Sequence, residues 1–431
     1  MTTTRFQAPR GTQDVLPAGQ PYWTAIHDAI REVARLFGFQ RIDTPAFEPA
    51  GVFEKGSGDT TDVVEKEMYT FEDRGGERLA LAPEGTPAIV RAYLEHGMAS
   101  WPQPVRLFTT KHMFRYDRPQ RGRYRQHTQF DCEIIGSAEP LADFEVIHIL
   151  WSLYARLGLR NLTVHLNSID DPEPRRSYVE RLKDHFRPHF GQLSEDSKRR
   201  FDRNPLRLLD SKEPQDEPFK QGAPTLIDSL SEPARLHHEQ LTAALSAAGI
   251  PFTTDPFLVR GLDYYNRTVF EIVPDDDERA QGTVGGGGRY DGLAEVLGGP
   301  HTPGVGFGSG FERIILEMQK YETAPAESEG VHVFVVQRGG AALAPAVRLV
   351  ADLREAGISA LLGETGRSFK SQFRSADSAG ARLALIVGED EVARGMVGVK
   401  SLREQRDQTE EPLDAIVDTV QNLLNGNVAN G

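Results

Sequence analysis

Cysteine is almost absent from the 431-residue chain, in which Cys132 is the single example. One cysteine cannot form an internal disulfide, so the sequence favours a reducing cytoplasm. No apolar run approaches the ~18 residues of a transmembrane helix. No apolar stretch follows the first basic residue, Arg5, as it would in a secretory signal. We therefore expect a cytoplasmic protein that does not partner with a membrane.

Several familiar binding and catalytic motifs are missing as well. The chain has no GK dipeptide, which excludes a Walker-type phosphate loop, and its glycine runs do not match GxGxxG. HExxH is absent, and no Cys/His set has the spacing of zinc ligands. His185 and His189 lie four residues apart, but the intervening Pro188 favours two exposed polar residues. The sequence therefore predicts no metal site built from protein ligands alone.

The composition is that of a folded globular protein. Hydrophobic residues make up 39% of the chain and charged residues 26%, which excludes a disordered chain or a coiled-coil rod. The length predicts two or three domains. A net charge of −14 argues against a protein that coats nucleic acid without specificity.

Positive charge is nevertheless concentrated in one stretch, residues 103–130. This stretch contains a single acid, Asp117, and seven bases: Arg106, Lys111, Arg115, Arg118, Arg121, Arg123 and Arg125. Clustered arginines repel one another unless an anion compensates them. The pattern therefore favours an anion site over a solvated arginine-rich loop.

Hydrophobic periodicity outlines the secondary structure. Helices are expected over residues 21–37, 143–157 and 310–318. Thr86, in the segment PEGT, is expected to cap a further helix that has Pro87 in its first position. Strands are expected over residues 39–45, 78–82, 105–115, 128–135, 256–260, 268–272 and 304–307.

The chain is expected to divide into two domains. The first spans residues 1–328 and contains a highly charged, mostly helical insertion at about 172–250. Residues 322–330 have the composition of a linker. In residues 329–431 strands alternate with helices, which predicts a small α/β domain.

One expected strand carries three polar side chains on the same face. Period-two alternation groups Gln129, Asp131 and Glu133, and it turns Cys132 toward the core, where a packing role is expected. Three polar groups on an otherwise apolar strand are costly to bury without partners. A polar-ligand site is therefore favoured over a solvent-facing sheet surface.

Two further segments combine arginine with glycine. In LVRGLDYYNRTVFE, alternation would place Arg260 and Tyr264 on one face, while Gly261 permits close backbone approach. In GVGFGSGFERI, Arg313 follows a glycine run, and its planar guanidinium can stack on a base or bind phosphate. Packing of the glycines against a neighbouring backbone is the alternative interpretation of this run.

These segments resemble the three motifs of class II aminoacyl-tRNA synthetases. RIDTPAFEP resembles motif 1, MFRYDRPQRGRYRQHTQFDCEIIG resembles motif 2 and GVGFGSGFERI resembles motif 3. LVRGLDYYNRTVFE and GGGGRYDGL look like the two signatures of the histidyl-tRNA synthetase family, and PEGT and LLDSKEP also fit it. The resemblance covers nearly the whole chain. It implies an α+β catalytic domain with an antiparallel sheet flanked by helices, an α/β anticodon-binding domain at the C-terminus, and a homodimer joined through motif 1.

The resemblance also implies a reaction: ATP-dependent ligation of L-histidine to tRNA(His) through histidyl-adenylate, with release of pyrophosphate and AMP. Arg115 and Arg260 would be catalytic, and Mg²⁺ would accompany ATP. The implied ATP-binding residues are Arg115, Asp117, Arg123, His127 and Arg313. Two of these depart from the family pattern, since motif 2 usually has glutamate at Asp117 and phenylalanine at His127.

The same resemblance implies a histidine pocket and a contact with tRNA. The implied histidine-binding residues are Glu84, Gly85, Thr86, Arg115, Gln129, Glu133, Arg260, Tyr264 and Tyr265. Among them, Glu84, Thr86 and Gln129 would hold the ammonium group, and Glu133 with the tyrosine pair would bind the imidazole. Arg118 and Gln120 would meet the acceptor end of the tRNA.

Two other functions fit parts of the pattern. A histidine-sensing regulatory subunit related to these synthetases usually lacks the C-terminal domain and has eroded signatures, whereas this chain keeps both. A class II synthetase for threonine, proline or glycine is disfavoured by the LDYY segment and, for threonine, by the lack of zinc ligands. An active histidine enzyme is therefore the favoured hypothesis.

Overall fold

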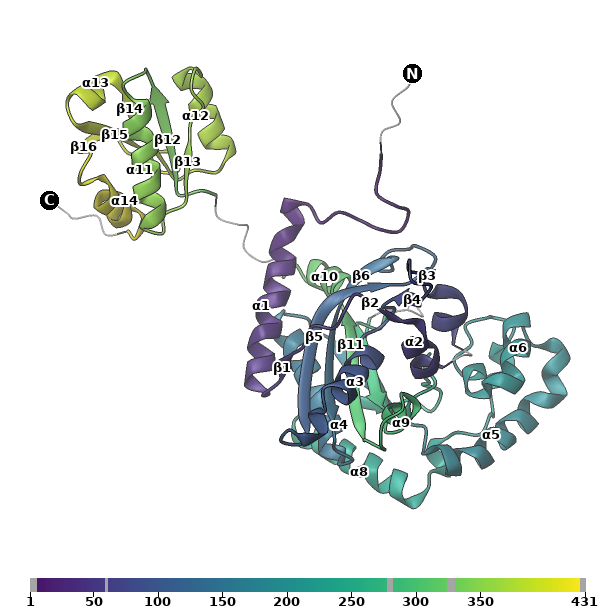
Figure 1. Cartoon of the computed structure of the whole chain (residues 1–431). Helices are drawn as coiled ribbons and strands as arrows, with labels where there is room; N and C mark the ends of the chain where they lie inside the picture. Colours follow the sequence, from purple (N-terminus) through teal and green to yellow (C-terminus); the bar gives the residue numbers. More distant parts are fainter. Residues whose placement is uncertain (1–5, 59–60, 277–281, 324–329, 427–431) are drawn as a thin grey trace, which may run out of the picture. The chain divides into compact units, whose positions relative to one another are not determined.

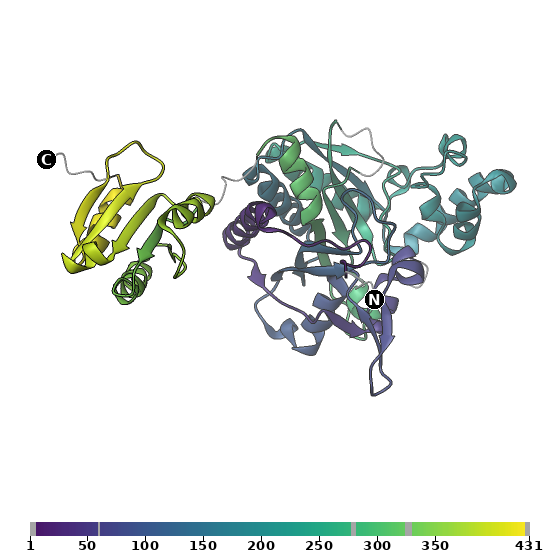
Figure 2. The same cartoon turned by 90° about the horizontal axis from the view of Figure 1, so that it is seen from above.

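The computed structural model describes residues 6–58, 61–276, 282–323 and 330–426, which form two compact units, Met1–Pro325 and Ala326–Gly431. Figure 1 shows the elements of both units and Figure 2 gives a second view. The expected boundary at 328/329 lies within residues 324–329, outside the described residues. Each unit is described by itself.

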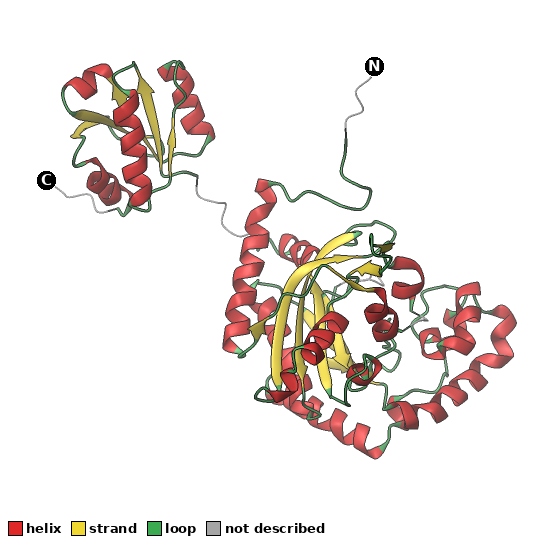
Figure 3. Ribbon diagram, in the orientation of Figure 1, coloured by secondary structure: helices red, strands yellow, loops and turns green. Residues whose placement is uncertain are grey.

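The first unit is built on an eight-stranded sheet (Figure 3). Its interior pairs are antiparallel, but each edge pair is parallel, β1 with β5 and β7 with β8. The expected antiparallel sheet is thus mixed at its edges. In spatial order the strands are β1 (Gln40–Arg41), β5 (Val105–Phe114), β6 (Gln126–Ile135), β11 (Gly304–Gly310), β10 (Gly285–Arg289), β9 (Asn266–Pro274), β7 (Leu162–Ser168) and β8 (Phe252–Thr254).

One face of this sheet is covered by helices. Phe130, Cys132 and Ile134 of β6 join a core cluster that includes Ile30 of α1 and Val146 of α4. Cys132 is fully buried there, as the alternation predicts, and burial raises the pKa of its thiol well above the usual value. The helices that contribute to the cluster are α1 (Gln20–Leu36), α4 (Pro140–Arg156), α8 (Glu232–Ala247) and α10 (Phe311–Lys320).

Helices α2 (Ala50–Ser57) and α3 (Thr86–Glu95) accompany a small three-stranded sheet. Its strands are β2 (Phe47–Pro49), β4 (Arg78–Leu81) and β3 (Thr70–Glu72). The capping role expected for Thr86 is wrong: Gly85 is the N-cap, Thr86 is the first helical residue, and its hydroxyl is bonded to Glu133 instead. A buried carboxylate is the stronger acceptor and takes the hydroxyl.

Two strand expectations also differ from the structure. Of the expected strand 39–45, only Gln40–Arg41 is observed, because pairing with β5 ends at Arg41. Residues 256–260 form no strand, because the chain turns at their start, where the amide of Phe257 donates to the Asp255 side chain. The alternation that grouped Arg260 with Tyr264 therefore does not apply. Conversely, the glycine run 285–288 forms the buried strand β10, although glycine gives no strand signal.

The charged stretch 172–250 is mostly helical, as expected. Its helices α5 (Pro172–Phe186), α6 (Glu195–Arg203) and α7 (Glu217–Lys220) lie around a second small core, whereas α8 (Glu232–Ala247) buries Leu241 and Leu245 in the core of the main sheet. Tyr178, Leu182 and Phe186 of α5 are buried in the second core. Beside it, the Asp216 carboxylate accepts hydrogen bonds from three serine hydroxyls, those of Ser194, Ser197 and Ser211.

The second unit is a five-stranded sheet with helices. β12 pairs in parallel with β13 and β14, and β15 and β16 continue the sheet antiparallel. The strands are β12 (Val333–Arg338), β13 (Ala360–Leu362), β14 (Leu383–Gly388), β15 (Met396–Ser401) and β16 (Thr409–Pro412). The helices are α11 (Leu343–Glu355), α12 (Phe369–Ser378), α13 (Glu389–Ala393) and α14 (Ile416–Leu424).

Candidate active site

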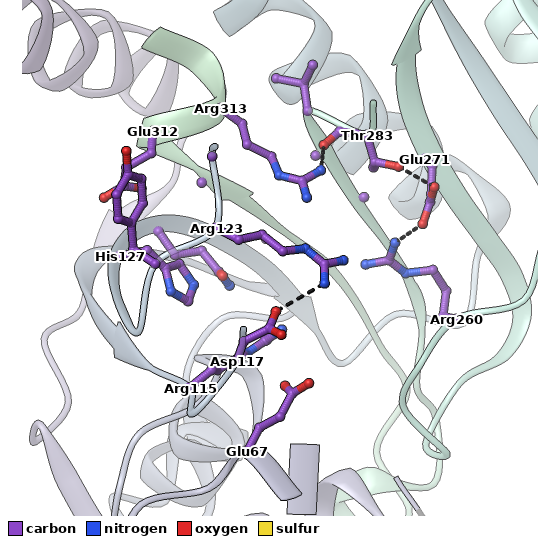
Figure 4. Close-up of a pocket in the computed structure, with 18 of the residues that line it drawn as sticks. Glu67, Arg115, Asp117, Arg123, His127, Arg260, Glu271, Thr283, Glu312 and Arg313 are labelled. Carbon is purple, nitrogen blue, oxygen red and sulfur yellow. Dashed lines mark hydrogen bonds and ion pairs between the residues drawn. The ribbon is translucent and has the colours of Figure 1, made fainter. Parts of the chain in front are cut away.

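A cavity of about 350 Å³ lies where β6, β9, β10 and β11 meet the start of α10 and the loop between β5 and β6 (Figure 4). Its lining is strongly charged. The cations are Arg115, Arg123, Lys212, Arg260 and Arg313, and the acids are Glu67, Asp117, Glu271 and Glu312. A cavity with this lining suits a large polyanionic ligand.

The four arginines come from three segments of the chain, since Arg115 and Arg123 share the loop between β5 and β6, and each is held by an acceptor. Arg115 Nε donates to the carbonyl of Pro83 at 2.8 Å, and Arg123 Nη1 donates to Asp117 Oδ2 at 3.0 Å. Arg260 is paired with Glu271, and Arg313 donates to the carbonyl of Thr283. Figure 4 shows the guanidinium groups converging on one space. Each guanidinium has five N–H donors, so these anchors fix the groups without using all their donors.

His127 lines the same cavity with a neutral ring. Burial, assisted by the charge of nearby Arg115, lowers the pKa of His127 to about 3. At neutral pH the ring therefore carries no charge, and its face can stack on a base.

A second group of residues adjoins Gln129, which also lines the cavity. Glu84, 3% exposed, accepts hydrogen bonds from Ser57 and from Tyr264, whose hydroxyl lies 2.8 Å from Glu84 Oε2. Glu133, fully buried, accepts from Thr86 at 2.6 Å and from the hydroxyl of Tyr290.

No cation is paired with these acids among the hydrogen-bonded or ion-paired side chains that the structure describes. Burial consequently raises the pKa of Glu84, and it raises the pKa of Glu133 to about 8 and that of Asp131 to about 7. Acids with such raised pKa values in a pocket are typical of functional sites. A bound cation would favour their ionised forms.

Glycines make room for these acids. A Cβ on Gly306 would overlap the Glu133 carboxylate, and one on Gly308 would overlap the Gln129 amide. A Cβ on Gly288 would approach the Tyr265 ring to 2.9 Å. The site-facing side of β10 and β11 is therefore main chain.

The structure brings most of the expected site residues together. Arg115, Asp117, Arg123, His127, Gln129, Arg260 and Arg313 all line the charged cavity. Glu84, Thr86, Glu133 and Tyr264 belong to the two acid-centred hydrogen-bond groups, and Gly85 lies against Asp131.

Three of the expected residues lie elsewhere. Tyr265 packs on the Tyr264 ring, with 4.6 Å between centroids, and lines a different cavity beneath the insertion. Arg118 and Gln120 do not line the charged cavity and lie in the loop between β5 and β6.

Several residues of the cavity and of the acid-centred groups were not singled out from the sequence. Tyr290 lies in the segment GGGGRYDGL, Lys212 in LLDSKEP and Glu271 at the end of LVRGLDYYNRTVFE, so these three segments carried a usable signal. Ser57 and Thr283 lie in segments with no such pattern, and their positions emerge only from the fold.

The structure offers no ready-made metal cage. Within the described ranges, no group of three or more His, Cys, Asp or Glu side chains is arranged to hold a metal ion. Nor does any helix described combine the length and apolar character needed to cross a membrane.

Comparison with known proteins matches a family profile to each of the two units. A family profile described as histidyl-tRNA synthetase matches residues 11–170 and 178–314, and one described as anticodon binding domain matches residues 331–423. A histidine–tRNA ligase from Dehalococcoides mccartyi is 47% identical over 412 residues, which span 96% of this chain and 98% of the relative. One from Moorella thermoacetica is 46% identical over 410 residues, which span 95% and 96%. The crystal structure of apo histidyl-tRNA synthetase from Staphylococcus aureus matches with a TM-score of 0.82 and 35% identity, covering 97% of this chain and all of that one.

Proposed function

Because this chain belongs to the histidyl-tRNA synthetase family, we propose that the charged cavity and the buried acids Glu84, Asp131 and Glu133 beside it carry out its reaction. The protein ligates L-histidine to tRNA(His) with consumption of ATP, by way of histidyl-adenylate, and releases pyrophosphate and AMP. The convergence of four arginines from three segments on one cavity is the observation that supports this placement most directly. Full-length similarity to named ligases favours the enzyme over a regulatory subunit.

In the first step the histidine carboxylate attacks the α-phosphate of ATP. Such a transfer needs positioning and charge neutralisation more than a covalent helper. We assign Arg115 and Arg260 to the α-phosphate and the histidine carboxylate. Their anchors, the Pro83 carbonyl and Glu271, hold both guanidinium groups in place before the substrates arrive.

The remaining cavity residues would hold the rest of ATP. Arg123 and Arg313 would bind the outer phosphates, and Arg313 would also lie over the adenine. His127 would stack its neutral ring on the base. Asp117 is a shorter acid than the family pattern has, and it is paired with Arg123, so its contribution to ATP binding includes orienting that arginine.

Mg²⁺ fits the donor set of this cavity. Mg²⁺ is usually bound by one or two carboxylates together with phosphate oxygens and waters, so the absence of a protein cage is no obstacle. The carboxylates of Glu67 and Glu271 line the cavity and would hold it beside the phosphates. When bound, the ion would neutralise charge on the pyrophosphate leaving group.

Histidine would bind at the Gln129 end of the charged cavity, against the buried acids Glu84, Asp131 and Glu133. Glu133 and Tyr264 would bind the two imidazole nitrogens, with Tyr265 supporting the Tyr264 ring. A site with a partner for each nitrogen disfavours side chains that leave a buried partner unpaired. Glu84, Thr86 and Gln129 would face the ammonium group, beside the main chain of Gly85.

The second step and the assembly rest on the other parts of the chain. Arg118 and Gln120 would meet the acceptor end of tRNA(His), and the unit beginning at residue 331 would bind the anticodon.

We propose a homodimer joined through the motif 1 segment, whose strand β1 lies at an open edge of the sheet and whose Phe47 is half exposed. We also propose a cytoplasmic location, in keeping with a single buried cysteine.

Amino-acid-dependent exchange of pyrophosphate into ATP tests the proposal. The purified chain is assayed with each of the twenty amino acids in turn, with and without Mg²⁺. Exchange with histidine alone, and only with Mg²⁺, is expected. Exchange with a different amino acid would refute the pocket assignment, and no exchange at all would favour a regulatory protein. Sedimentation of the same sample tests the dimer.

A further inference from the structure

Asp131 is a buried acid of the site to which the proposed reaction gives no individual role. The carboxylates of Glu84, Asp131 and Glu133 lie close together and contain six oxygen atoms. Both oxygens of Glu84 and both of Glu133 accept hydrogen bonds from neutral hydroxyls. Asp131 Oδ1 accepts from Gln129 Nε2, whereas Asp131 Oδ2 has no partner among the described residues.

This unpartnered oxygen lies in a tightly closed place. Asp131 is only 1% exposed, and a Cβ on Gly85 would come within 2.8 Å of its carboxyl carbon. A Cβ on Gly308 would come within 3.1 Å of Oδ1. A buried acceptor without a donor destabilises the protein, and a ligand that supplies the donor can remove that penalty.

The bond from Gln129 to Asp131 also determines what Gln129 offers a ligand. An ionised carboxylate only accepts, so the amide must turn its NH₂ group toward Asp131. The carbonyl oxygen of Gln129 is then left as an acceptor, next to the second N–H of the same amide. A cationic N–H donor can therefore meet two acceptors, the Gln129 carbonyl and Asp131 Oδ2.

Nearby cations do not satisfy Asp131. The Lys111 ammonium on β5 donates to the hydroxyl of Thr44 and to the carbonyl of Pro45. Arg115 lowers the pKa of Asp131 only through its charge, with no hydrogen bond to it among the described atoms. Among the described residues no donor reaches Asp131 Oδ2, which leaves this oxygen available to a donor on a ligand.

We propose that Asp131 is a positioning residue for the amino-acid substrate: it orients Gln129 and supplies the negative charge that holds the α-ammonium group of histidine. This inference rests on the proposed function and extends it. Thr86 and the Gln129 amide, which the sequence resemblance assigned to the ammonium group, donate to acids here. The charge complementary to the ammonium therefore resides in Glu84 and Asp131.

One structural alternative is visible on the same strand pair. Thr109 stands directly opposite Asp131 in the β5–β6 register, and its hydroxyl also has no partner among the described residues. A buried water between the two side chains would satisfy both. In that case Asp131 would stabilise the sheet and would not bind the amino-acid substrate.

The test compares two ligands and two variants. Binding of L-histidine and of 3-(imidazol-4-yl)propionate, which lacks only the amino group, is measured by calorimetry for the full chain, Asp131→Asn and Thr109→Val. Asp131→Asn keeps the shape but removes the charge. Thr109→Val removes the hydroxyl that a buried water would bridge to Asp131, so it is the matched control for that alternative. Melting temperatures report whether each variant folds.

We expect Asp131→Asn to weaken histidine binding about 10- to 100-fold, as for a lost hydrogen bond to a charged group. Binding of the deamino analogue should change less than about twofold, and Thr109→Val should leave both ligands unaffected. In pyrophosphate exchange, KM for histidine should rise while KM for ATP stays constant. Equal losses for both ligands, or no loss, would overturn the inference. Failure of the unmodified chain to bind histidine would refute the proposed function instead.

Discussion

Arg260→His is the substitution that tests the arrangement of the cavity most directly. The guanidinium of Arg260 lies in the cavity with that of Arg115 and is held by Glu271. Histidine is too short to reach the same place and is mostly neutral at pH 7.5. Adenylate formation therefore loses one fixed cation at the reacting phosphate.

The loss can be given a magnitude. Removing one preorganised donor at a centre of developing charge costs about 2.7–4 kcal/mol, or 10²–10³-fold in kcat. The effect on folding is much smaller, because the side chains of Arg260 and Glu271 are 22% and 23% exposed and a partly solvated pair contributes about 1 kcal/mol or less. Such a change shifts Tm by at most about 4 °C.

Arg267→His is the matched control. Arg267 has a similar exposure of 21% and is likewise paired with an acid, Asp171, but it does not line the cavity. Histidine-dependent pyrophosphate exchange should fall at least 100-fold in Arg260→His and less than about threefold in Arg267→His. Calorimetric melting should show similar small shifts in both. Exchange at the unmodified rate in Arg260→His would remove this arginine from the chemical step.

Three further changes have defined outcomes. Gly306→Ala places a methyl group where the Glu133 carboxylate lies; histidine binding by calorimetry should be lost, and near-normal affinity would show that the pocket can relax. Burial alone would raise the pKa of Asp143, but Arg289 and then His237 lower it to about 2. Because this folded-state pKa is below the ordinary value, about 2 kcal/mol of stability is present above pH 4 and lost as pH falls toward 2. Urea unfolding should show this loss, and an equal loss in Asp143→Asn would exclude Asp143 as its source. Deleting residues 331–431, which form a separate compact unit, should leave pyrophosphate exchange intact and reduce tRNA charging at least tenfold; undiminished charging would contradict anticodon binding by this unit.

Elements with a strong periodic pattern could be predicted from the sequence. The expected helix 21–37 is observed as α1, and the expected strands 105–115 and 128–135 as β5 and β6. Their apolar faces are buried, so local pattern and tertiary packing agree. The strand expected at 256–260 is wrong because a side-chain turn at Asp255 overrides a short apolar run.

The site could be predicted only in part, and the missing part has a physical cause. Arginines, acids and tyrosines carry chemistry that is visible in a sequence. The glycines of β10 have no side chains to form an alternating hydrophobic pattern, so this part of the cavity wall could not be predicted as a strand. Glu271 was missed because its role follows from its place beside Arg260 across the sheet. The destination of the Thr86 hydroxyl depends on β6, 47 residues away in the sequence.

The bare surface of β10 and β11 has a consequence for redesign. Because main chain already forms that wall, any replacement of Gly306 or Gly308 can only subtract volume, and no truncation there can add any. Variants that accept bulkier amino acids must instead shorten side chains that contact the buried acids, such as Tyr264, which bonds Glu84, or Tyr290, which bonds Glu133. A mutant library directed at the two glycine strands would return inactive clones. A library directed at the two tyrosines can enlarge the binding site, because a shorter side chain leaves volume for a larger substrate.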